Sequence, residues 1–222
     1  MITKELQKRI LSSIILIPIA IFFIFQENFF FIFFLSILFI TTSYEWLNIC
    51  KTNFLKIIGV FYLFFAFTSA YLLREKFSLG IFILILIICI FTDLGGYIFG
   101  KVFKGPKLIK ISPNKTYAGA IGSFILSIFA ALVYSKYTAY GATTTINLSI
   151  LTGLTLNKIF LLFILIMSFI NQVGDLIISY FKRLAKVKDT GNLLPGHGGL
   201  LDRVDGIIFV MPISYLLLSY LR

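Results

Sequence analysis

The sequence predicts an all-α, polytopic transmembrane helical protein with about 7–9 spans. Hydrophobic residues make up 59% of the 222-residue chain, whereas soluble domains are about 45–50% apolar. Charged residues make up only 13% of the chain. Several apolar runs approach the length of roughly 20 residues that a helix needs to cross the hydrocarbon core of a membrane. These observations exclude an ordinary soluble domain.

Seven apolar runs predict the spans in chain order. They are Ile10–Phe25, Phe29–Trp46, Phe54–Leu73, Leu79–Phe99, Tyr117–Tyr134, Ile159–Tyr180 and Ile207–Leu221. The first run follows basic residues, as a signal peptide would, but no small-residue cleavage site follows it and the second run starts almost at once. We therefore expect a retained first helix. Residues 146–156 leave room for an extra or re-entrant segment.

Basic residues predict the orientation of these spans. With the N-terminus inside and seven spans, fifteen of the twenty Lys and Arg residues fall on the cytoplasmic side, which is the asymmetry expected of membrane proteins. The two basic loops, 101–116 and 181–206, then face the same compartment. The formal charge of +11 is explained by basic residues that orient the protein in the membrane and that bind anionic lipids or ligands, so no nucleic-acid partner is expected.

The chain divides at residue 93, because polar groups are concentrated after it. Residues 1–92 are predicted to form N-terminal transmembrane helices, and residues 93–222 a C-terminal transmembrane region that carries both basic loops. Glu45 lies near the end of the second run beside Trp46, where it is explained at least as well as an interfacial anchor as by a functional role.

The most informative stretch is residues 179–206, a polar and glycine-rich block between two apolar runs. It holds three of the five aspartates, the only histidine and five of the twenty basic residues. On the helix before it, Asn171, Asp175, Ser179 and Lys182 share one face. An intramembrane carboxylate such as Asp175 is by default a functional candidate. The alternative is a stripe that only packs against polar groups of a neighbouring helix.

The donor types favour a hard cation together with phosphate. Cys50 and Cys89 lie alone and are expected to be free thiols. Aspartates without a Cys or His cluster suit Mg²⁺, which is commonly held by one or two carboxylates, water and substrate phosphates. The neighbouring Lys and Arg residues suit a metal that arrives with a polyphosphate. The pattern therefore indicates nucleotide or phosphate chemistry.

Two loops are candidate phosphate sites. In Pro195-Gly-His-Gly-Gly199 the glycines let backbone N–H groups approach a ligand, although such a loop can also be only a tight turn. Ser112-Pro-Asn-Lys-Thr116 offers hydroxyls and a lysine just before a helix start, which favours an anion. His197 is ambiguous between a structural role and a hydrogen bond toward a leaving group. The absence of a GxxxxGK[ST] pattern leaves an ordinary P-loop ATPase unsupported.

Together these motifs resemble the signature of the bacterial phosphatidate cytidylyltransferase (CDP-diacylglycerol synthase) family. The matching elements, in the expected order, are Ser112-Pro-Asn-Lys-Thr116, Asn171-Gln-Val-Gly-Asp175 with Ser179, Lys182-Arg183, Lys188-Asp189, Pro195-Gly-His-Gly-Gly199 and Asp202-Arg-Val-Asp-Gly206. The resemblance covers roughly the C-terminal half from Asp93, whereas the N-terminal spans match only in being apolar. Ala118 is a departure, because family members usually carry an acidic residue there.

The resemblance implies that CTP and phosphatidate react to give CDP-diacylglycerol and pyrophosphate. It also implies a multi-pass protein of the bacterial inner membrane, in contact with membrane lipids, whose active site faces the cytoplasm. A polar cavity lined by the cytoplasmic ends of the fourth and sixth spans would admit both substrates. The cofactor is expected to be Mg²⁺, with a second cation and a homodimer left open.

The resemblance also implies roles for individual residues. The expected metal ligands are Asp175, Asp202 and Asp205. The expected catalytic residues are Asp175, Lys182, Arg183, Lys188, Asp189, His197, Asp202 and Arg203. The expected substrate-binding residues are Ser112, Lys115, Thr116, Ser179, Gly196, Gly198 and Gly199.

Two other functions stay open. The DxxDG pattern at 202–206 also opens the motif of CDP-alcohol phosphotransferases, but that motif continues with aspartates and no acidic residue follows Asp205 here. An ion transporter would use Asp93 and Asp175 in its pathway. The chain shows no repeated halves with interrupted helices, however, and its polarity is concentrated in two loops.

Overall fold

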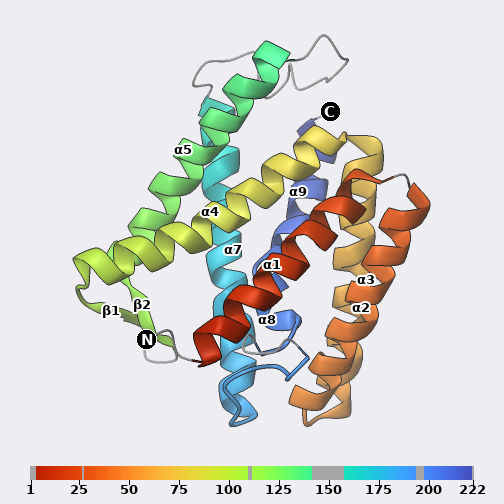
Figure 1. Cartoon of the computed structure of the whole chain (residues 1–222), viewed down its shortest axis with the longest axis vertical. Coiled ribbons are helices and arrows are strands. Elements are labelled where there is room, and N and C mark those ends of the chain that lie inside the picture. Colours follow the sequence, from red (N-terminus) through yellow and green to blue (C-terminus); the bar gives the residue numbers. More distant parts are fainter. Residues whose placement is uncertain (1–3, 27, 110–111, 142–157, 194–197, 222) are drawn as a thin grey trace.

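Helices form most of the computed structural model, which describes residues 4–26, 28–109, 112–141, 158–193 and 198–221 (Figure 1). The long helices are α1 (Lys4–Phe25), α2 (Asn28–Ile49), α3 (Asn53–Lys76), α4 (Leu79–Phe103), α5 (Tyr117–Gly141), α7 (Lys158–Leu184) and α9 (Ile207–Leu221). The shorter elements are α8 (Leu201–Val204) and the strands β1 (Lys107–Ile109) and β2 (Ser112–Thr116).

Five helices of the described part, α2, α3, α4, α5 and α7, are long and apolar enough to cross a membrane. The predicted first and last spans correspond to shorter apolar helices, Leu16–Phe25 within α1 and Ile207–Leu221. The prediction of an all-α protein with several membrane-spanning helices is confirmed at this level, and the count of about 7–9 spans stays a prediction. The possible extra segment at 146–156 lies outside the described residues.

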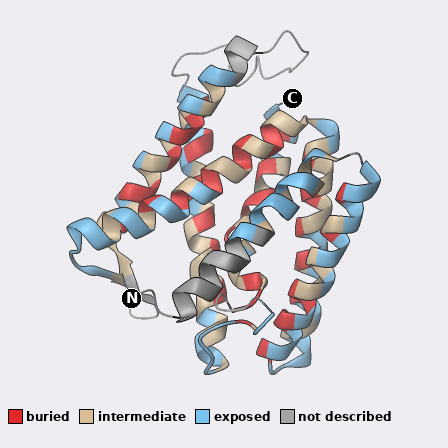
Figure 2. Cartoon of the chain, in the orientation of Figure 1, coloured by how far each residue is buried: buried red, intermediate tan, exposed pale blue. Residues whose placement is uncertain are grey.

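The outer surface is rich in large apolar side chains, whereas the main core cluster takes its buried residues from α2, α3, α4, α5, α7 and α9 (Figure 2). Phe61 of α3, for example, is 71% exposed. Such exposure is expected where lipid replaces water as the solvent. Between the core helices, Thr92 Oγ1 donates to Ser168 Oγ at 2.9 Å, and Ser123 Oγ donates to the Thr92 carbonyl at 2.7 Å. These bonds tie α4 to both α7 and α5.

A two-stranded antiparallel hairpin interrupts the helices within the basic loop 101–116. Lys107 of β1 pairs with Thr116 of β2, and Ile109 pairs with Ser112. The second strand leads directly into α5, where the Gly119 N–H donates to Thr116 Oγ1 at 3.1 Å. This bond is a helix N-cap, since it satisfies one of the N–H groups that have no partner within the helix. The hairpin therefore fixes Lys115 and Thr116 at the start of α5.

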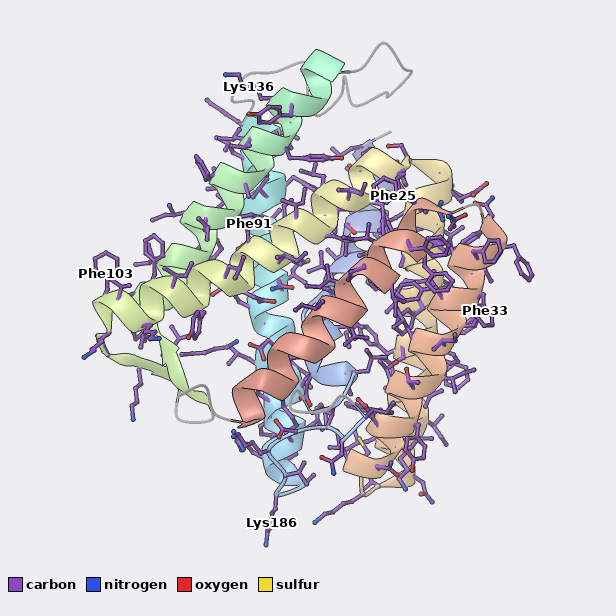
Figure 3. The ribbon with its side chains drawn as sticks, in the orientation of Figure 1. Phe25, Phe33, Phe91, Phe103, Lys136 and Lys186 are labelled. Carbon is purple, nitrogen blue, oxygen red and sulfur yellow. The ribbon has the colours of Figure 1, made fainter. Side chains whose placement is uncertain are left out.

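The two basic loops lie at the same end of the molecule. The hairpin between α4 and α5 and the connection between α7 and α9 both lie in the lower half of Figure 1, the hairpin at the left and the connection at the bottom. Lys186, just after α7, lies at that end, and Lys136 of α5 lies at the opposite end (Figure 3). This arrangement agrees with the orientation pattern of the basic residues, which places Lys186 and Lys136 on opposite sides.

Small residues allow α4 and α5 to pack closely. A Cβ atom at Gly95 would lie 2.4 Å from the Gly122 carbonyl oxygen and 2.8 Å from Ser123 Cα, both of which are backbone atoms. Small residues at a helix interface are a common means of close approach in membranes. The interface leaves no space for a methyl group at Gly95.

Gly95→Ala is therefore expected to lower the free energy of unfolding by about 1–3 kcal/mol, because one helix must shift away from the other. Gly100→Ala is the matched control, since its nearest neighbour is the Thr116 hydroxyl at 3.3 Å. Thermal unfolding of both variants in detergent micelles checks this expectation. An equal loss of stability in the two variants would contradict close packing at Gly95.

Candidate active site

A cavity of about 310 Å³ lies where α4, α5 and α7 meet the hairpin. Asp93 lines it from α4, Lys115 and Thr116 from β2, and Asp175 from α7. The sequence predicted a cavity between the ends of the fourth and sixth spans, which correspond to α4 and α7. The structure adds α5 and the hairpin as further walls, so Lys115 and Thr116 of the motif at 112–116 and Asp175 of the polar stripe on α7 face one space.

Lys115 and Asp175 form an ion pair in this cavity. The distance from Lys115 Nζ to Asp175 Oδ2 is 2.5 Å, and the two side chains are 25% and 30% exposed. Lys115 Nζ also donates to the Gln172 carbonyl at 3.4 Å, and Ser179 Oγ donates to Asp175 Oδ1 at 3.3 Å. A partly exposed pair of this kind contributes little to stability, so the lysine is available to exchange its partner for an incoming anion.

Two residues of the predicted polar stripe on α7, Asn171 and Asp175, have partners on other elements. Asn171 is fully buried, and its Nδ2 donates to Asp93 Oδ1 at 2.8 Å. One turn later Asp175 faces Lys115. The stripe therefore contacts α4 through Asn171 and lines the cavity through Asp175, so it is more than a packing contact between two helices.

Asp205 lies against Asp175. The two carboxyl groups are hydrogen-bonded to each other. Burial, followed by the negative charge of Asp175, raises the pKa of Asp205 well above its ordinary range. A Cβ atom at Gly206 would lie 2.3 Å from Asn171 Oδ1, so only glycine lets the chain after Asp205 pass this close to α7.

Asp202 has a different environment from its neighbour Asp205. Its side chain is 8% exposed, and its Oδ1 accepts a hydrogen bond from Lys182 Nζ at 2.7 Å, in an ion pair whose lysine side chain is 12% exposed. Its Oδ2 lies within hydrogen-bond distance of three donors: the Thr190 N–H at 2.7 Å, the Thr190 hydroxyl at 2.9 Å and the Gly199 N–H at 3.0 Å. Asp202 therefore ties the loop together in this structure.

The structure thus divides the three aspartates predicted as metal ligands. It brings Asp175 and Asp205 into contact but commits Asp202 to Lys182 and the loop. Across the described residues, no group of three or more Asp, Glu, His or Cys side chains is arranged to hold a metal. The metal role of Asp202 stays a prediction.

The predicted glycine loop is described only in part. Gly196, His197 and the side chain of Ser112 lie outside the described residues. Gly198 has φ +88°, a backbone conformation that favours glycine. The Gly199 N–H is donated to Asp202, which is a use other than the predicted contact with substrate.

The remaining predicted cations and Asp189 lie at the surface of the loop end. Arg183, Lys188, Asp189 and Arg203 are exposed. Arg183 Nη1 donates to the Val187 carbonyl at 3.4 Å. The structure therefore separates two sets of basic groups: Lys115 and Lys182 are partly buried and paired to aspartates, whereas Arg183, Lys188 and Arg203 are exposed.

The interpretation of Glu45 as an interfacial anchor is wrong. Its side chain is 1% exposed. It accepts hydrogen bonds from the Leu200 and Leu201 N–H groups, both at 2.8 Å, and from the Thr190 hydroxyl at 2.9 Å. The available signal was a carboxylate inside an apolar run, and the neighbouring Trp46 suggested the simpler explanation.

Comparison with known proteins places the C-terminal three quarters of the chain in a described family. A sequence profile of the cytidylyltransferase family matches residues 54–221. A phosphatidate cytidylyltransferase of Staphylococcus aureus (strain COL) is 37% identical over 185 residues, which cover 81% of this chain and 66% of the relative. The profile match includes every wall of the cavity but not Glu45.

Two further phosphatidate cytidylyltransferases show similar likeness. The one of Staphylococcus haemolyticus is 43% identical over 128 residues, covering 57% of this chain and 44% of the relative. The one of Brucella suis is 36% identical over 161 residues, covering 71% and 54%. The matched parts of the chain thus span 44–66% of the length of these curated relatives.

Proposed function

Because this chain belongs to the cytidylyltransferase family, we propose that it transfers cytidylate from CTP to phosphatidate, giving CDP-diacylglycerol and pyrophosphate. The relatives with this activity in their names support the choice of substrates. The observation that carries the proposal is the cavity in which Lys115 meets Asp175 at the loop end of an apolar helix bundle. A lipid phosphate and a soluble nucleotide can meet at such a place.

The reaction requires two anions to approach each other. An oxygen of the phosphatidate phosphate attacks the α-phosphorus of CTP, that P–O bond forms, and the bond to the pyrophosphate leaving group breaks. Lys115 is placed to neutralise a phosphate in the cavity, since its present partner is a partly exposed carboxylate. The Thr116 hydroxyl accepts from α5 and keeps its own proton for a ligand oxygen. Catalysis then rests on positioning and charge neutralisation.

The donor set at Asp175 and Asp205 fits Mg²⁺. Two ionised carboxyl groups in contact repel each other, and a bound cation would relieve that repulsion. These two side chains would hold the metal, which when bound neutralises charge on the phosphate oxygens of CTP. Other side chains orient these carboxylates: Ser179 orients Asp175 through a hydrogen bond, and Asn171 orients the neighbouring Asp93 in the same way.

We further propose that the loop end faces the cytoplasm from the bacterial inner membrane. Fifteen of the twenty basic residues fall on that side in the predicted topology. CTP would reach the cavity from water, while phosphatidate would keep its acyl chains in the bilayer and present its phosphate at the interface.

The deciding experiment incubates the purified protein with phosphatidate, CTP labelled in the cytosine ring, and Mg²⁺. Label should pass into the lipid phase only when phosphatidate, CTP and Mg²⁺ are all present. A CDP-alcohol phosphotransferase would instead consume CDP-diacylglycerol in the presence of an alcohol and leave CTP untouched. Ion flux into liposomes that does not depend on CTP would support the transporter alternative.

Lys115→Met tests the phosphate role of this lysine. We expect kcat/KM for CTP to fall by about 10²-fold, the usual effect of losing one charge-stabilising donor. Lys101→Met is the matched control, because Lys101 is exposed, does not line the cavity, and donates only a long hydrogen bond of 3.5 Å to the Tyr97 hydroxyl among the described contacts. The label-transfer assay measures both variants, and equal losses would remove Lys115 from the reaction.

A further inference from the structure

The contacts of Glu45 join α2 to the loop that follows α7. Within the described residues its hydrogen-bond donors are in Thr190, Leu200 and Leu201, which lie at least 145 residues further along. A carboxylate this deeply buried is tolerated where donors replace its lost water. Glu45 therefore fits one particular arrangement of the loop, in which two successive backbone N–H groups point at it.

Two glycines of the loop close around this carboxylate. A Cβ atom at Gly199 would lie 2.5 Å from Glu45 Oε2, and one at Gly191 would lie 3.0 Å from Glu45 Oε1. The absence of side chains at these positions lets the loop backbone reach the acid. Part of the glycine-rich character of the block is thus explained by Glu45 rather than by a ligand.

The carboxylate connects to the reaction site through Thr190. The Thr190 hydroxyl lies 2.9 Å from both Glu45 Oε2 and Asp202 Oδ2, and its single proton can serve only one of them at a time. Asp202 in turn pairs with Lys182, whose charge acts on Asp175 and Asp205. Movement at Glu45 would therefore change the surroundings of the proposed metal carboxylates.

The helix that carries Glu45 is firmly held at this point. Trp46 Nε1 donates to the Leu55 carbonyl at 3.1 Å, and its ring centroid is 4.9 Å from that of Phe181 on α7. Gly59 leaves the space that the indole fills, since a Cβ atom there would lie 1.8 Å from Trp46 Nε1. Glu45 thus projects from an element that is fixed against both α3 and α7.

We infer that Glu45 is a positioning residue for the proposed transfer reaction. Its carboxylate holds the backbone at Leu200 and Leu201, the start of α8, and so sets the places of Asp202 within that turn and of Asp205 just after it. This inference rests on the proposed function for its effect on rate. The fixing of the loop can be measured without it.

Glu45→Gln is the test, because it keeps the shape and turns one acceptor oxygen into a donor that faces a backbone N–H. We expect kcat to fall by about 10–100-fold and the Mg²⁺ concentration for half-maximal rate to rise, as is typical when a supporting partner is lost. Trypsin cleavage of the folded protein after Lys188 and Arg203 should accelerate. Glu75→Gln, at an exposed position on α3, should change none of these.

Thr190→Val is the second variant, for the case that Glu45→Gln does not fold. It removes the hydroxyl link alone, so the same rise in Mg²⁺ requirement is expected. Where Glu45→Gln does fold, the double variant should lose little more activity than Glu45→Gln. An unchanged Mg²⁺ requirement and unchanged trypsin cleavage in the folded variants would overturn the inference. If the wild-type protein shows no cytidylate transfer, but trypsin still cleaves the variants faster than the wild type, the proposed function is contradicted and the role of Glu45 in the loop is supported.

Discussion

Asp175→Asn is expected to lower kcat for cytidylate transfer by about 10³-fold, the upper end of what one charge-stabilising group supplies. The substitution keeps the size of the side chain but removes its charge. That charge pairs with Lys115 at 2.5 Å and meets Asp205, so it lies where the proposed Mg²⁺ and the phosphates would come together. Label transfer at saturating CTP, measured over a series of Mg²⁺ concentrations, gives the size of the loss.

Ser179→Ala is the control for this variant. It removes only the 3.3 Å hydrogen bond to Asp175 Oδ1 and leaves the carboxylate charged, so its effect on kcat should be far smaller. Both proteins should unfold near the wild-type temperature, because the Lys115–Asp175 pair is partly exposed and such pairs contribute little to stability. Near-normal, Mg²⁺-dependent turnover by Asp175→Asn would exclude Asp175 from the metal site.

Apolar length predicted the long helices well, and it predicted their ends less well. The run Leu79–Phe99 became α4, which continues to Phe103 because Lys101 and its neighbours still make helical backbone hydrogen bonds after the apolar stretch ends. The hairpin could not be predicted in the same way. Strands of three and five residues that pair only with each other carry too little periodicity to be recognised.

The site was predicted in its residue types but not in its pairings. Helical spacing placed Asn171 and Asp175 on one face, and the structure shows that face meeting Asp93 and Lys115. No spacing rule distinguishes Asp202 from Asp205, which are separated by a single turn. Glu45 was missed for a related reason, since its partners at Thr190, Leu200 and Leu201 can be found only from the folded structure.

Asp202→Ala is expected to cause the largest loss of stability, about 3–5 kcal/mol, because it leaves Lys182 charged, nearly buried and without its partner. It also removes the acceptor for the Thr190 and Gly199 N–H groups. Thermal unfolding in detergent, at fixed pH and lipid content, measures the change.

A double variant separates the two roles that Asp202 could have. Suppose that the main role of Asp202 is to fix the loop. The double variant Lys182→Met with Asp202→Asn should then recover more than half of the stability that Asp202→Ala loses, because replacing both members of a buried ion pair costs far less than removing one of them. Asp202→Asn alone should then keep the wild-type Mg²⁺ requirement in whatever fraction folds. A Mg²⁺ requirement raised as far as in Asp175→Asn would show the opposite. Asp202 would then give up its ion pair with Lys182 and bind the metal itself during the reaction, and the loop would rearrange when CTP arrives.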